Sequence, residues 1–91
     1  MCVRIQIPAN LRPHVGGLTE VEVQGGSVFV ALDALCQAYP EVREYLFRNP
    51  RQLQPHLNVF VQGQSIRDLA GLDTPLTPDT AVLIVPALAG G

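Results

Sequence analysis

The sequence predicts an α+β domain in which a mixed sheet of four to five strands packs on one main helix. Three observations predict it. Two early segments alternate apolar and polar residues, a third repeats apolar residues at helical spacing, and further strand-like segments follow. The chain has 91 residues, of which 47% are hydrophobic, so it can form one small core but not two domains.

The first two strands are predicted from period-two alternation. Val3, Ile5 and Ile7 alternate with polar residues, as do Val21 and Val23, and residues 8–17 between the two strands are expected to form a loop. We expect the apolar side chains to face the helix. The polar side chains then lie on the open face of the sheet: Arg4, Gln6, Glu20, Glu22 and Gln24.

The main helix is predicted to begin after Ser27, which can cap its first turn, and to end before Pro40. Its apolar residues share one face: Val28, Ala31, Leu32, Leu35, Cys36 and Tyr39. Gly25-Gly26-Ser27 could instead cradle a phosphate, but a turn followed by a helix cap explains the segment without one. A second short helix is expected over residues 41–48, and two prolines make the connection after it irregular.

The second half of the chain is predicted to complete the sheet. Residues 57–62 form a third strand that turns at Gly63, and a short strand can follow around Ile66 and Arg67. Residues 70–80 contain a glycine and two prolines and are expected to be a loop. Residues 81–85 are all apolar, which predicts a central strand with apolar contacts on both faces.

A proline then separates the domain from its last residues. Pro86 cannot donate a hydrogen bond to a sheet, so we expect a domain over residues 1–85 and a flexible tail over residues 86–91. The tail has no charged side chain and ends in Gly90 and Gly91, whose lack of a Cβ allows a partner to approach the carboxylate closely. A frayed end is the alternative. The combination with an apolar strand and a proline favours a tail that threads a narrow channel.

The composition excludes several classes of function. Six arginines against eight acidic residues give a net charge of −2, which lacks the basic footprint of a nucleic-acid or anionic-membrane binder. The apolar runs are too short to span a membrane, and the alternating first strand lacks the apolar block of a signal peptide, so we expect a cytoplasmic protein.

Self-contained catalysis is also disfavoured. The chain has no lysine to serve as a Schiff-base or general-base amine, and no paired carboxylates or Ser-His-Asp set stands out. Cys2 and Cys36 are expected to be free thiols. Together with His14 and His56 they lack the close spacing of zinc ligands, so no metal site is expected.

The order of elements and two segments resemble one known family. The ending Val82-Leu83-Ile84-Val85-Pro86-Ala87-Leu88-Ala89-Gly90-Gly91 is similar to that of the β-grasp, ubiquitin-like sulfur carriers. That family includes the small subunit of molybdopterin synthase, the sulfur carrier of the thiamine pathway and the carrier of a cysteine-synthesis route. The segment Leu11-Arg12-Pro13-His14-Val15-Gly16-Gly17 most resembles the cysteine-synthesis carriers. One departure is Pro78-Asp79-Thr80, where many members place Asp-Gly-Asp or Asp-Gly-Glu before the last strand.

The resemblance implies a protein cosubstrate rather than an enzyme. It implies that an E1-like partner uses ATP to adenylate the Gly91 carboxylate, and that sulfur from a persulfide donor replaces the adenylate to give a thiocarboxylate. A sulfur-acceptor enzyme then consumes the thiocarboxylate. This acceptor is a cysteine synthase-like enzyme, the large subunit of molybdopterin synthase or another enzyme, and residues 11–17 favour cysteine synthesis. No cofactor is expected to bind the carrier itself.

A partner is expected to dock beside the tail. Phe60 should lie on the open face of the sheet, and the last strand adds either Leu83 and Val85 or Val82 and Ile84. The residues predicted to dock the activating enzyme are Phe60, Leu83 and Val85, with the tail residues Leu88, Ala89 and Gly90 leading to Gly91. The turn that follows could instead cover Phe60. Arg12 and His14 are candidate contacts for acidic groups of an acceptor enzyme, in a loop that could equally be only solvated.

Two alternatives stay open. The same terminal chemistry could attach the chain to lysines of other proteins as a ubiquitin-like modifier, although a chain without lysine could not build lysine-linked polymers of itself. The chain could instead be a permanent subunit, such as the small subunit of molybdopterin synthase, whose tail only fills a groove of its partner.

Overall fold

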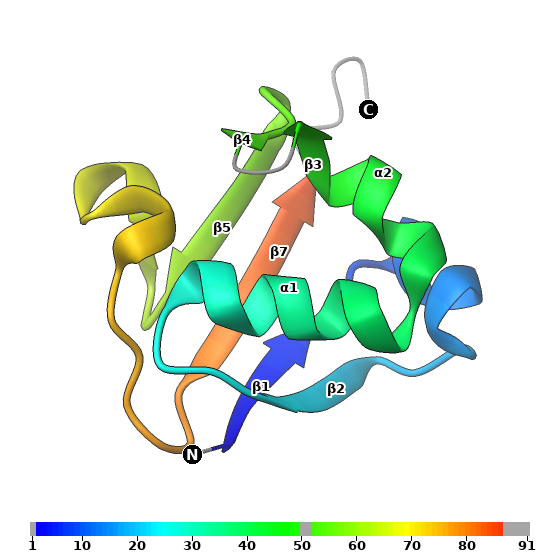
Figure 1. Cartoon of the computed structure of the whole chain (residues 1–91), viewed down its shortest axis with the longest axis horizontal. Helices are drawn as coiled ribbons and strands as arrows, with labels where there is room; N and C mark the ends of the chain where they lie inside the picture. Colours follow the sequence, from blue (N-terminus) through cyan, green and yellow to red (C-terminus); the bar gives the residue numbers. More distant parts are fainter. Residues whose placement is uncertain (1, 50–51, 87–91) are drawn as a thin grey trace.

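The computed structural model describes residues 2–49 and 52–86, which form a five-stranded sheet crossed by one helix (Figure 1). The strands lie in the order β2 (Glu20–Gln24), β1 (Cys2–Gln6), β7 (Ala81–Pro86), β5 (Leu57–Val61) and β6 (Gln64–Ser65). β1 and β7 are parallel and the other neighbours antiparallel, so the sheet is mixed. The predicted α+β architecture is confirmed.

The first hairpin follows its alternating pattern. β1 pairs with β2 in an unbroken register from Cys2 opposite Gln24 to Gln6 opposite Glu20. Val3 and Ile5 are fully buried, whereas Arg4 and Gln6 are exposed on the other face. The predicted orientation of both strands is confirmed, and a polar surface covers this half of the open face.

Residues 8–17 are not the predicted loop. They contain a 3-10 helix, η1 (Ala9–Val15), which buries Leu11 and Val15 in the core. Gly16 ends it with a φ of 68°, a left-handed conformation that glycine adopts without steric cost. The residues that predicted a loop are compatible with a short helix, because Pro13 lies within η1 and Gly16 ends it. The helical turn between Leu11 and Val15 lets both side chains point into the core.

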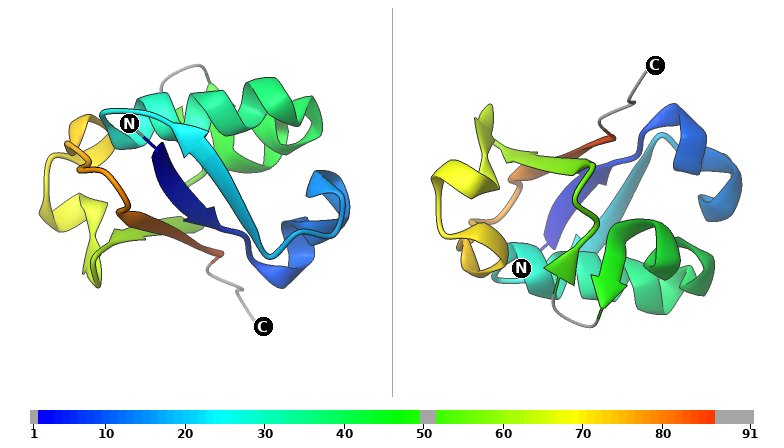
Figure 2. Two further views of the ribbon diagram at one scale, coloured as in Figure 1. Left: turned by 90° about the horizontal axis from the view of Figure 1, so that it is seen from below. Right: turned by 90° about the horizontal axis from the view of Figure 1, so that it is seen from above.

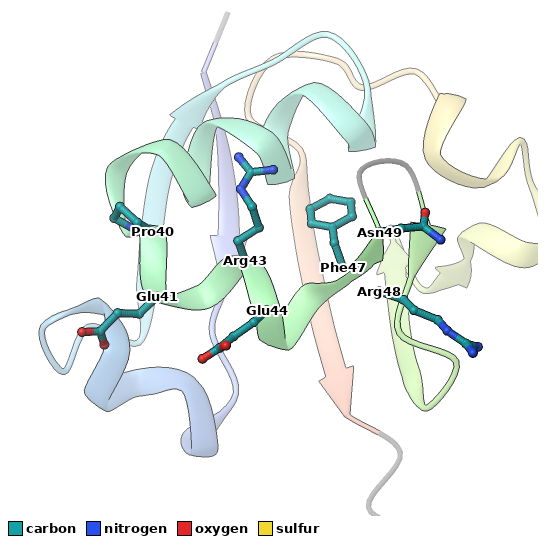
Figure 3. A pocket seen from close by; sticks show the side chains of 7 residues that line it. All are labelled: Pro40, Glu41, Arg43, Glu44, Phe47, Arg48 and Asn49. Atoms are coloured by element: carbon teal, nitrogen blue, oxygen red, sulfur yellow. The ribbon is translucent and has the colours of Figure 1, made fainter.

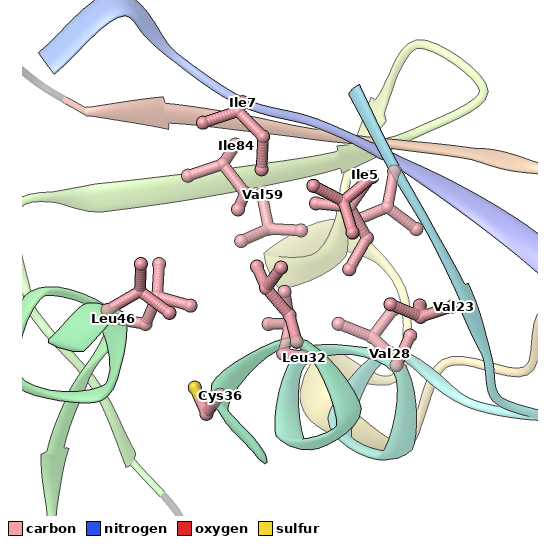
Figure 4. Close-up of a cluster of buried hydrophobic side chains, with 14 of the residues drawn as sticks. Ile5, Ile7, Val23, Val28, Leu32, Cys36, Leu46, Val59 and Ile84 are labelled. Atoms are coloured by element: carbon pink, nitrogen blue, oxygen red, sulfur yellow. The ribbon is translucent and has the colours of Figure 1, made fainter. Parts of the chain in front are cut away.

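The main helix α1 (Val28–Ala38) has the predicted cap and core face. Ser27 Oγ accepts a hydrogen bond from the Val30 N–H at 3.3 Å. Side chains from α1 and the sheet interlock between the two layers, with Leu32 and Cys36 facing Ile5, Val59 and Ile84 (Figure 4). None of the helices in residues 2–49 and 52–86 has the length and apolar character of a membrane span.

The segment after α1 differs from the predicted helix over residues 41–48. A 3-10 turn, η2 (Pro40–Val42), leads into α2 (Arg43–Leu46), and the chain then enters strand β3 (Phe47–Asn49), which pairs with β4 (Gln52–Leu53). Phe47 is 6% exposed and lies opposite Leu53. The pairing of these apolar residues ends the helix two residues early. Residues 50 and 51 of the connection predicted to be irregular lie outside the described residues.

The β5–β6 hairpin turns at the predicted glycine. Gln62 and Gly63 have φ of 52° and 82°, the left-handed pair that a tight two-residue turn requires. The short strand predicted around Ile66 and Arg67 is wrong by two residues, because β6 ends at Ser65. Ile66 instead begins the 3-10 helix η3 (Ile66–Asp68), where its side chain is 4% exposed.

The long segment before β7 is only partly the predicted loop. It contains another 3-10 helix, η4 (Gly71–Asp73), beside α1. In the turn Pro78-Asp79-Thr80, Asp79 adopts a φ of 65° and its N–H donates to the Cys2 carbonyl at 2.9 Å. This departure from the family pattern therefore still forms a turn that joins β7 to β1.

β7 is central in the sheet, as predicted, but its contacts are one-sided. Val82 and Ile84 are at most 1% exposed, whereas Leu83 between them is 40% exposed. The expectation of apolar contacts on both faces is wrong for Leu83, because α1 and α2 both lie on the same side of the sheet (Figure 2). β7 also runs one residue beyond the predicted strand, with Pro86 opposite Leu57.

Candidate functional site

The open face of the sheet carries a groove on β5 and β7. Its volume is about 500 Å³, and it is lined by Gln6, Phe60, Gln62, Gly63, Ala81, Leu83 and Val85. Phe60 lies directly opposite Leu83 in the register of the two strands. We call this feature the apolar groove, because Phe60, Leu83 and Val85 supply most of its large side chains.

The register of β7 decides between the two orientations that the sequence left open. Val82 and Ile84 are buried under α1, so Leu83 and Val85 face the open side. Phe60 is half-buried and still lines the groove, so the turn after β5 does not remove it from the surface. The structure therefore brings together the three predicted docking side chains of the sheet.

A second groove continues from the first and contains Arg12. It has a volume of about 370 Å³, and its lining includes Gln6 and Leu83, which also line the apolar groove. Arg12 is half-buried and its Nε donates to the Ile7 carbonyl at 3.3 Å. We call this feature the Arg12 groove. The predicted contacts Phe60, Leu83, Val85 and Arg12 thus share one continuous surface.

The tail predictions fall on another part of the chain. Leu88, Ala89, Gly90 and Gly91 lie outside the described residues. The described part of the chain ends with β7 at Pro86, on the strand that carries Leu83 and Val85. η1 follows β1 at the same end of the sheet, since β1 and β7 are parallel (Figure 2). Both grooves therefore contain a side chain of the strand whose last described residue is Pro86.

His14 is separated from Arg12, although both lie on η1. Its Nδ1 is 3.0 Å from Glu41 Oε2, and its ring stacks on Tyr45 with 4.7 Å between the ring centroids. Because Glu41 lies on η2 and Tyr45 on α2, these two contacts of His14 join η1 to both elements. The structure does not bring the two candidate acceptor contacts, Arg12 and His14, to one place.

The two cysteines have opposite environments. Cys2 is exposed, whereas Cys36 is buried on the core face of α1, as its place in the helical pattern predicted. Burial raises the pKa of the Cys36 thiol to about 11, with the nearby Arg43 opposing that rise. Across residues 2–49 and 52–86, no three His, Cys, Asp or Glu side chains gather in a way that could hold a metal ion.

Sequence reasoning missed a cavity of about 600 Å³ on the helical side of the molecule (Figure 3). It is lined by Pro40, Glu41, Arg43, Glu44, Phe47, Arg48 and Asn49. Arg43 bonds to Asp33 on α1 at 3.0 Å, and this hydrogen bond lowers the pKa of the Asp33 carboxyl. The cavity forms where α2 gives way to β3, so the predicted continuous helix offered no signal for it.

Known proteins resemble this chain over its full length. The model of the ThiS family matches residues 5–91. The sulfur carrier protein CysO of Mycobacterium tuberculosis is 33% identical over 93 residues, with 100% of both chains covered.

Two solved structures confirm the predicted β-grasp fold. A chain in the crystal structure of the Amycolatopsis orientalis BexX/CysO complex superposes with a TM-score of 0.90 at 30% identity, covering 98% of this chain and 99% of that one. The solution structure of small archaeal modifier protein 1 from Methanosarcina acetivorans gives a TM-score of 0.88 at 29% identity, covering 99% and 96%. The expectation of a carrier rather than an enzyme is confirmed by the family match. This chain belongs to the ThiS family and is a non-catalytic sulfur carrier protein.

Proposed function

We propose that this chain carries sulfur as a thiocarboxylate on Gly91 and delivers it for cysteine synthesis. One observation supports this proposal above the others: the full-length similarity, at 33% identity, to sulfur carriers named CysO. The segment of residues 11–17 that resembles cysteine-synthesis carriers adds to it. Residues 11–15 of this segment lie in η1, and Arg12 among them lines the Arg12 groove of the open face.

The proposed chemistry begins with a poor electrophile. A terminal carboxylate has a reference pKa of about 3.3–3.7, so at neutral pH it is ionised and resists attack by sulfide. An E1-like partner transfers AMP from ATP to one carboxylate oxygen and releases pyrophosphate. The outer sulfur of the donor persulfide then attacks the acyl carbon, the bond to the AMP oxygen breaks, and AMP leaves an acyl disulfide that joins Gly91 to the donor. A thiol reduces this S–S bond and becomes a disulfide with the donor sulfur, which releases the thiocarboxylate on Gly91.

The apolar groove supplies a surface on which a partner enzyme could dock. We propose that the apolar groove docks the activating enzyme, with Phe60, Leu83 and Val85 as its contacts, while Leu88, Ala89 and Gly90 extend Gly91 into the active site of that partner. Large apolar side chains at the centre of an interface dominate its binding energy. The Amycolatopsis relative was crystallised as a BexX/CysO complex, which supports a carrier that works by docking another protein.

The decisive test is the intact mass of the chain after incubation with ATP, the activating enzyme and a sulfide source. We expect one terminal oxygen to be replaced by sulfur, because the acyl-adenylate is the only activated carbonyl in the mixture. Deletion of Gly91 should abolish the change, and Gly91→Ala should slow it at least tenfold, because a Cβ obstructs the narrow approach to the carbonyl. An unchanged mass, or equal conversion of the shortened chain, would contradict the proposal.

The acceptor is tested in a second step. The thiocarboxylated chain is mixed with a cysteine synthase-like enzyme and the amino-acid substrate of that enzyme. Formation of the C–S bond leaves a cysteinyl adduct on Gly91, which is followed by intact mass, and free cysteine is measured after hydrolysis of that adduct returns the carboxylate. Sulfur that is retained with this enzyme but released to the large subunit of molybdopterin synthase would place the carrier in the other route.

A second candidate function is conjugation to other proteins. The similarity to small archaeal modifier protein 1, at 29% identity over 99% of this chain, favours it. The two functions differ in their products. Conjugation leaves adducts between Gly91 and target lysines that are larger than the carrier and resist thiols, whereas sulfur transfer returns the free carboxylate.

A further inference from the structure

We propose that Arg12 determines partner specificity by receiving a side-chain carboxylate from the protein that docks on the apolar groove. The inference rests on the proposed function, because it takes the activating enzyme as that protein. Arg12 and Glu20 both line the Arg12 groove. The matching surface of the partner therefore carries an aspartate or glutamate carboxylate opposite Arg12 and a basic side chain opposite Glu20. Four features of the structure support this assignment.

The first feature is the posture of the Arg12 side chain. Its Nε donates to the Ile7 carbonyl at 3.3 Å, which holds the guanidinium at the wall of the Arg12 groove. Within the described part of the chain, neither Nη group has a hydrogen-bond partner. A half-buried guanidinium fixed at Nε presents two Nη groups that match the two oxygens of a carboxylate.

The second feature is the contrast with the other described arginines. Arg4 donates through Nη2 to the Asp79 carbonyl, Arg67 donates through Nη2 to two backbone carbonyls, and Arg43 pairs with Asp33. These hydrogen bonds tie the three guanidiniums to the fold. Arg48 on β3 also lacks a bonded partner among residues 2–49 and 52–86, but it borders the cavity on the helical side (Figure 3). Among the described arginines, Arg12 is therefore the one that lines a groove of the open face.

The third feature is continuity with the proposed docking surface. Gln6 and Leu83 line both the apolar groove and the Arg12 groove. Leu83 is 40% exposed, so a protein that covers it also reaches the edge of the Arg12 groove. A carboxylate on that protein would leave water at the same time as Arg12, which strengthens a charged hydrogen bond.

The fourth feature is the carboxylate already present in the groove. Glu20 lines the Arg12 groove, yet neither Glu20 nor any other described carboxylate forms an ion pair with Arg12. The groove thus holds one unpaired cation and one unpaired anion. A partner with the opposite arrangement is favoured, and a partner with like charges in register is rejected.

The test measures the affinity of the carrier for the purified activating enzyme by titration calorimetry without ATP. Arg12→Gln should raise the Kd about tenfold, because it removes one charged hydrogen-bonding partner from the interface. Arg12→Lys should give an intermediate Kd, since lysine keeps the positive charge but lacks the two parallel N–H donors that match the two oxygens of a carboxylate. Arg48→Gln is the matched control, with the same change of charge on the other side of the molecule, and should bind as the unmodified chain does.

Three results would overturn the inference. Equal affinities of Arg12→Gln and Arg48→Gln would remove the proposed contact. A lower thermal unfolding midpoint of Arg12→Gln with an unchanged Kd would show that Arg12 only stabilises the fold through its hydrogen bond to Ile7 and does not bind the partner. Unchanged affinity for the activating enzyme with slower sulfur release to the acceptor would assign the carboxylate to the acceptor instead.

The intact-mass assay separates this inference from the proposed function. If the unmodified chain gains sulfur while Kd is independent of Arg12, the function stands and the inference fails. If Kd depends on Arg12 while no sulfur is gained, the inference stands and the proposed function fails.

Discussion

Cys36 illustrates how position alone sets the chemistry of a side chain in this domain. The thiolate is the reactive form of cysteine, and its formation at Cys36 is disfavoured because the side chain is 1% exposed in an apolar environment. Cys2, of the same residue type, is exposed on the first strand. We therefore attribute no sulfur chemistry to Cys36 and regard it as a small apolar member of the core.

This environment predicts a loss of stability at alkaline pH. The folded pKa of about 11 lies above the ordinary value of 9.0, so the unfolded chain releases the proton first. The contribution of Cys36 to the free energy of unfolding is fully present below pH 9. It falls by up to about 2–3 kcal/mol as the pH rises to 11, since each unit of difference between the folded and unfolded pKa corresponds to about 1.4 kcal/mol. Urea unfolding from pH 7 to 11 measures the decline, which should be smaller in Cys36→Ala. Parallel curves would contradict the assignment.

At the scale of elements, one glycine fixes the contact between β2 and α1. A Cβ on Gly25 would lie 2.7 Å from the backbone N of Ala31, whereas a Cβ on Gly26 would meet no atom within 4 Å. The closest atoms belong to the helix backbone, which cannot move aside as a side chain can. Gly25 thus serves the close approach of the helix to the strand, which explains the Gly25-Gly26-Ser27 segment without a phosphate.

The two glycines predict opposite effects of the same substitution. Gly25→Ala should destabilise the fold by about 1–3 kcal/mol, because overpacking forces α1 away from the sheet. Gly26→Ala should be neutral or stabilising by up to about 1 kcal/mol, because it reduces the freedom of the unfolded chain. Urea unfolding midpoints compare the two, and a Gly25→Ala protein as stable as Gly26→Ala would show that the helix shifts at no cost.

The elements that the sequence predicted best carry their own periodicity. β1, β2 and α1 bury regularly spaced side chains, so pattern and structure agree to within a residue. η1, β3 and β4 depend on distant partners: Leu11 and Val15 reach the core, and Phe47 lies opposite Leu53. η1 has only two buried apolar residues and no repeating pattern, and β3 and β4, with three and two residues, are too short to show one.

At the scale of the whole molecule, the candidate site exists because the sheet is covered on one side. Sequence alternation predicted that Phe60 faces outward, but the apolar strand β7 gave no alternation from which to choose its outward residues. Only the register with β5 shows that Leu83 lies opposite Phe60. The Arg12 groove depends on the position of η1 relative to β7, which no local pattern encodes.

This arrangement predicts that docking and stability can be separated on a single strand. Leu83→Asp and Phe60→Ala should raise the Kd for the activating enzyme at least tenfold, because both remove apolar contacts from the proposed interface. The change at exposed Leu83 should cost about 1 kcal/mol or less of unfolding free energy.

The matched control is the neighbouring buried residue. Ile84 is 1% exposed, so Ile84→Val should cost about 0.5–1.5 kcal/mol of stability and leave the Kd unchanged. Calorimetric titration and urea unfolding of the three variants test this separation. Activation of Phe60→Ala and Leu83→Asp with unaltered affinity would move the docking surface elsewhere.

The parallel pairing of β1 with β7 also bears on how the chain is made. Arg4 lies opposite Ala81, so β1 has only β2 as a neighbour until the ribosome has translated β7. The edge of β5 that pairs with β7 likewise has no neighbouring strand until β7 has been translated. The sheet is therefore completed only after β7 has been synthesised and has inserted between β1 and β5. A nascent polypeptide stalled before β7 leaves one edge of each of these two strands without its hydrogen-bonding neighbour.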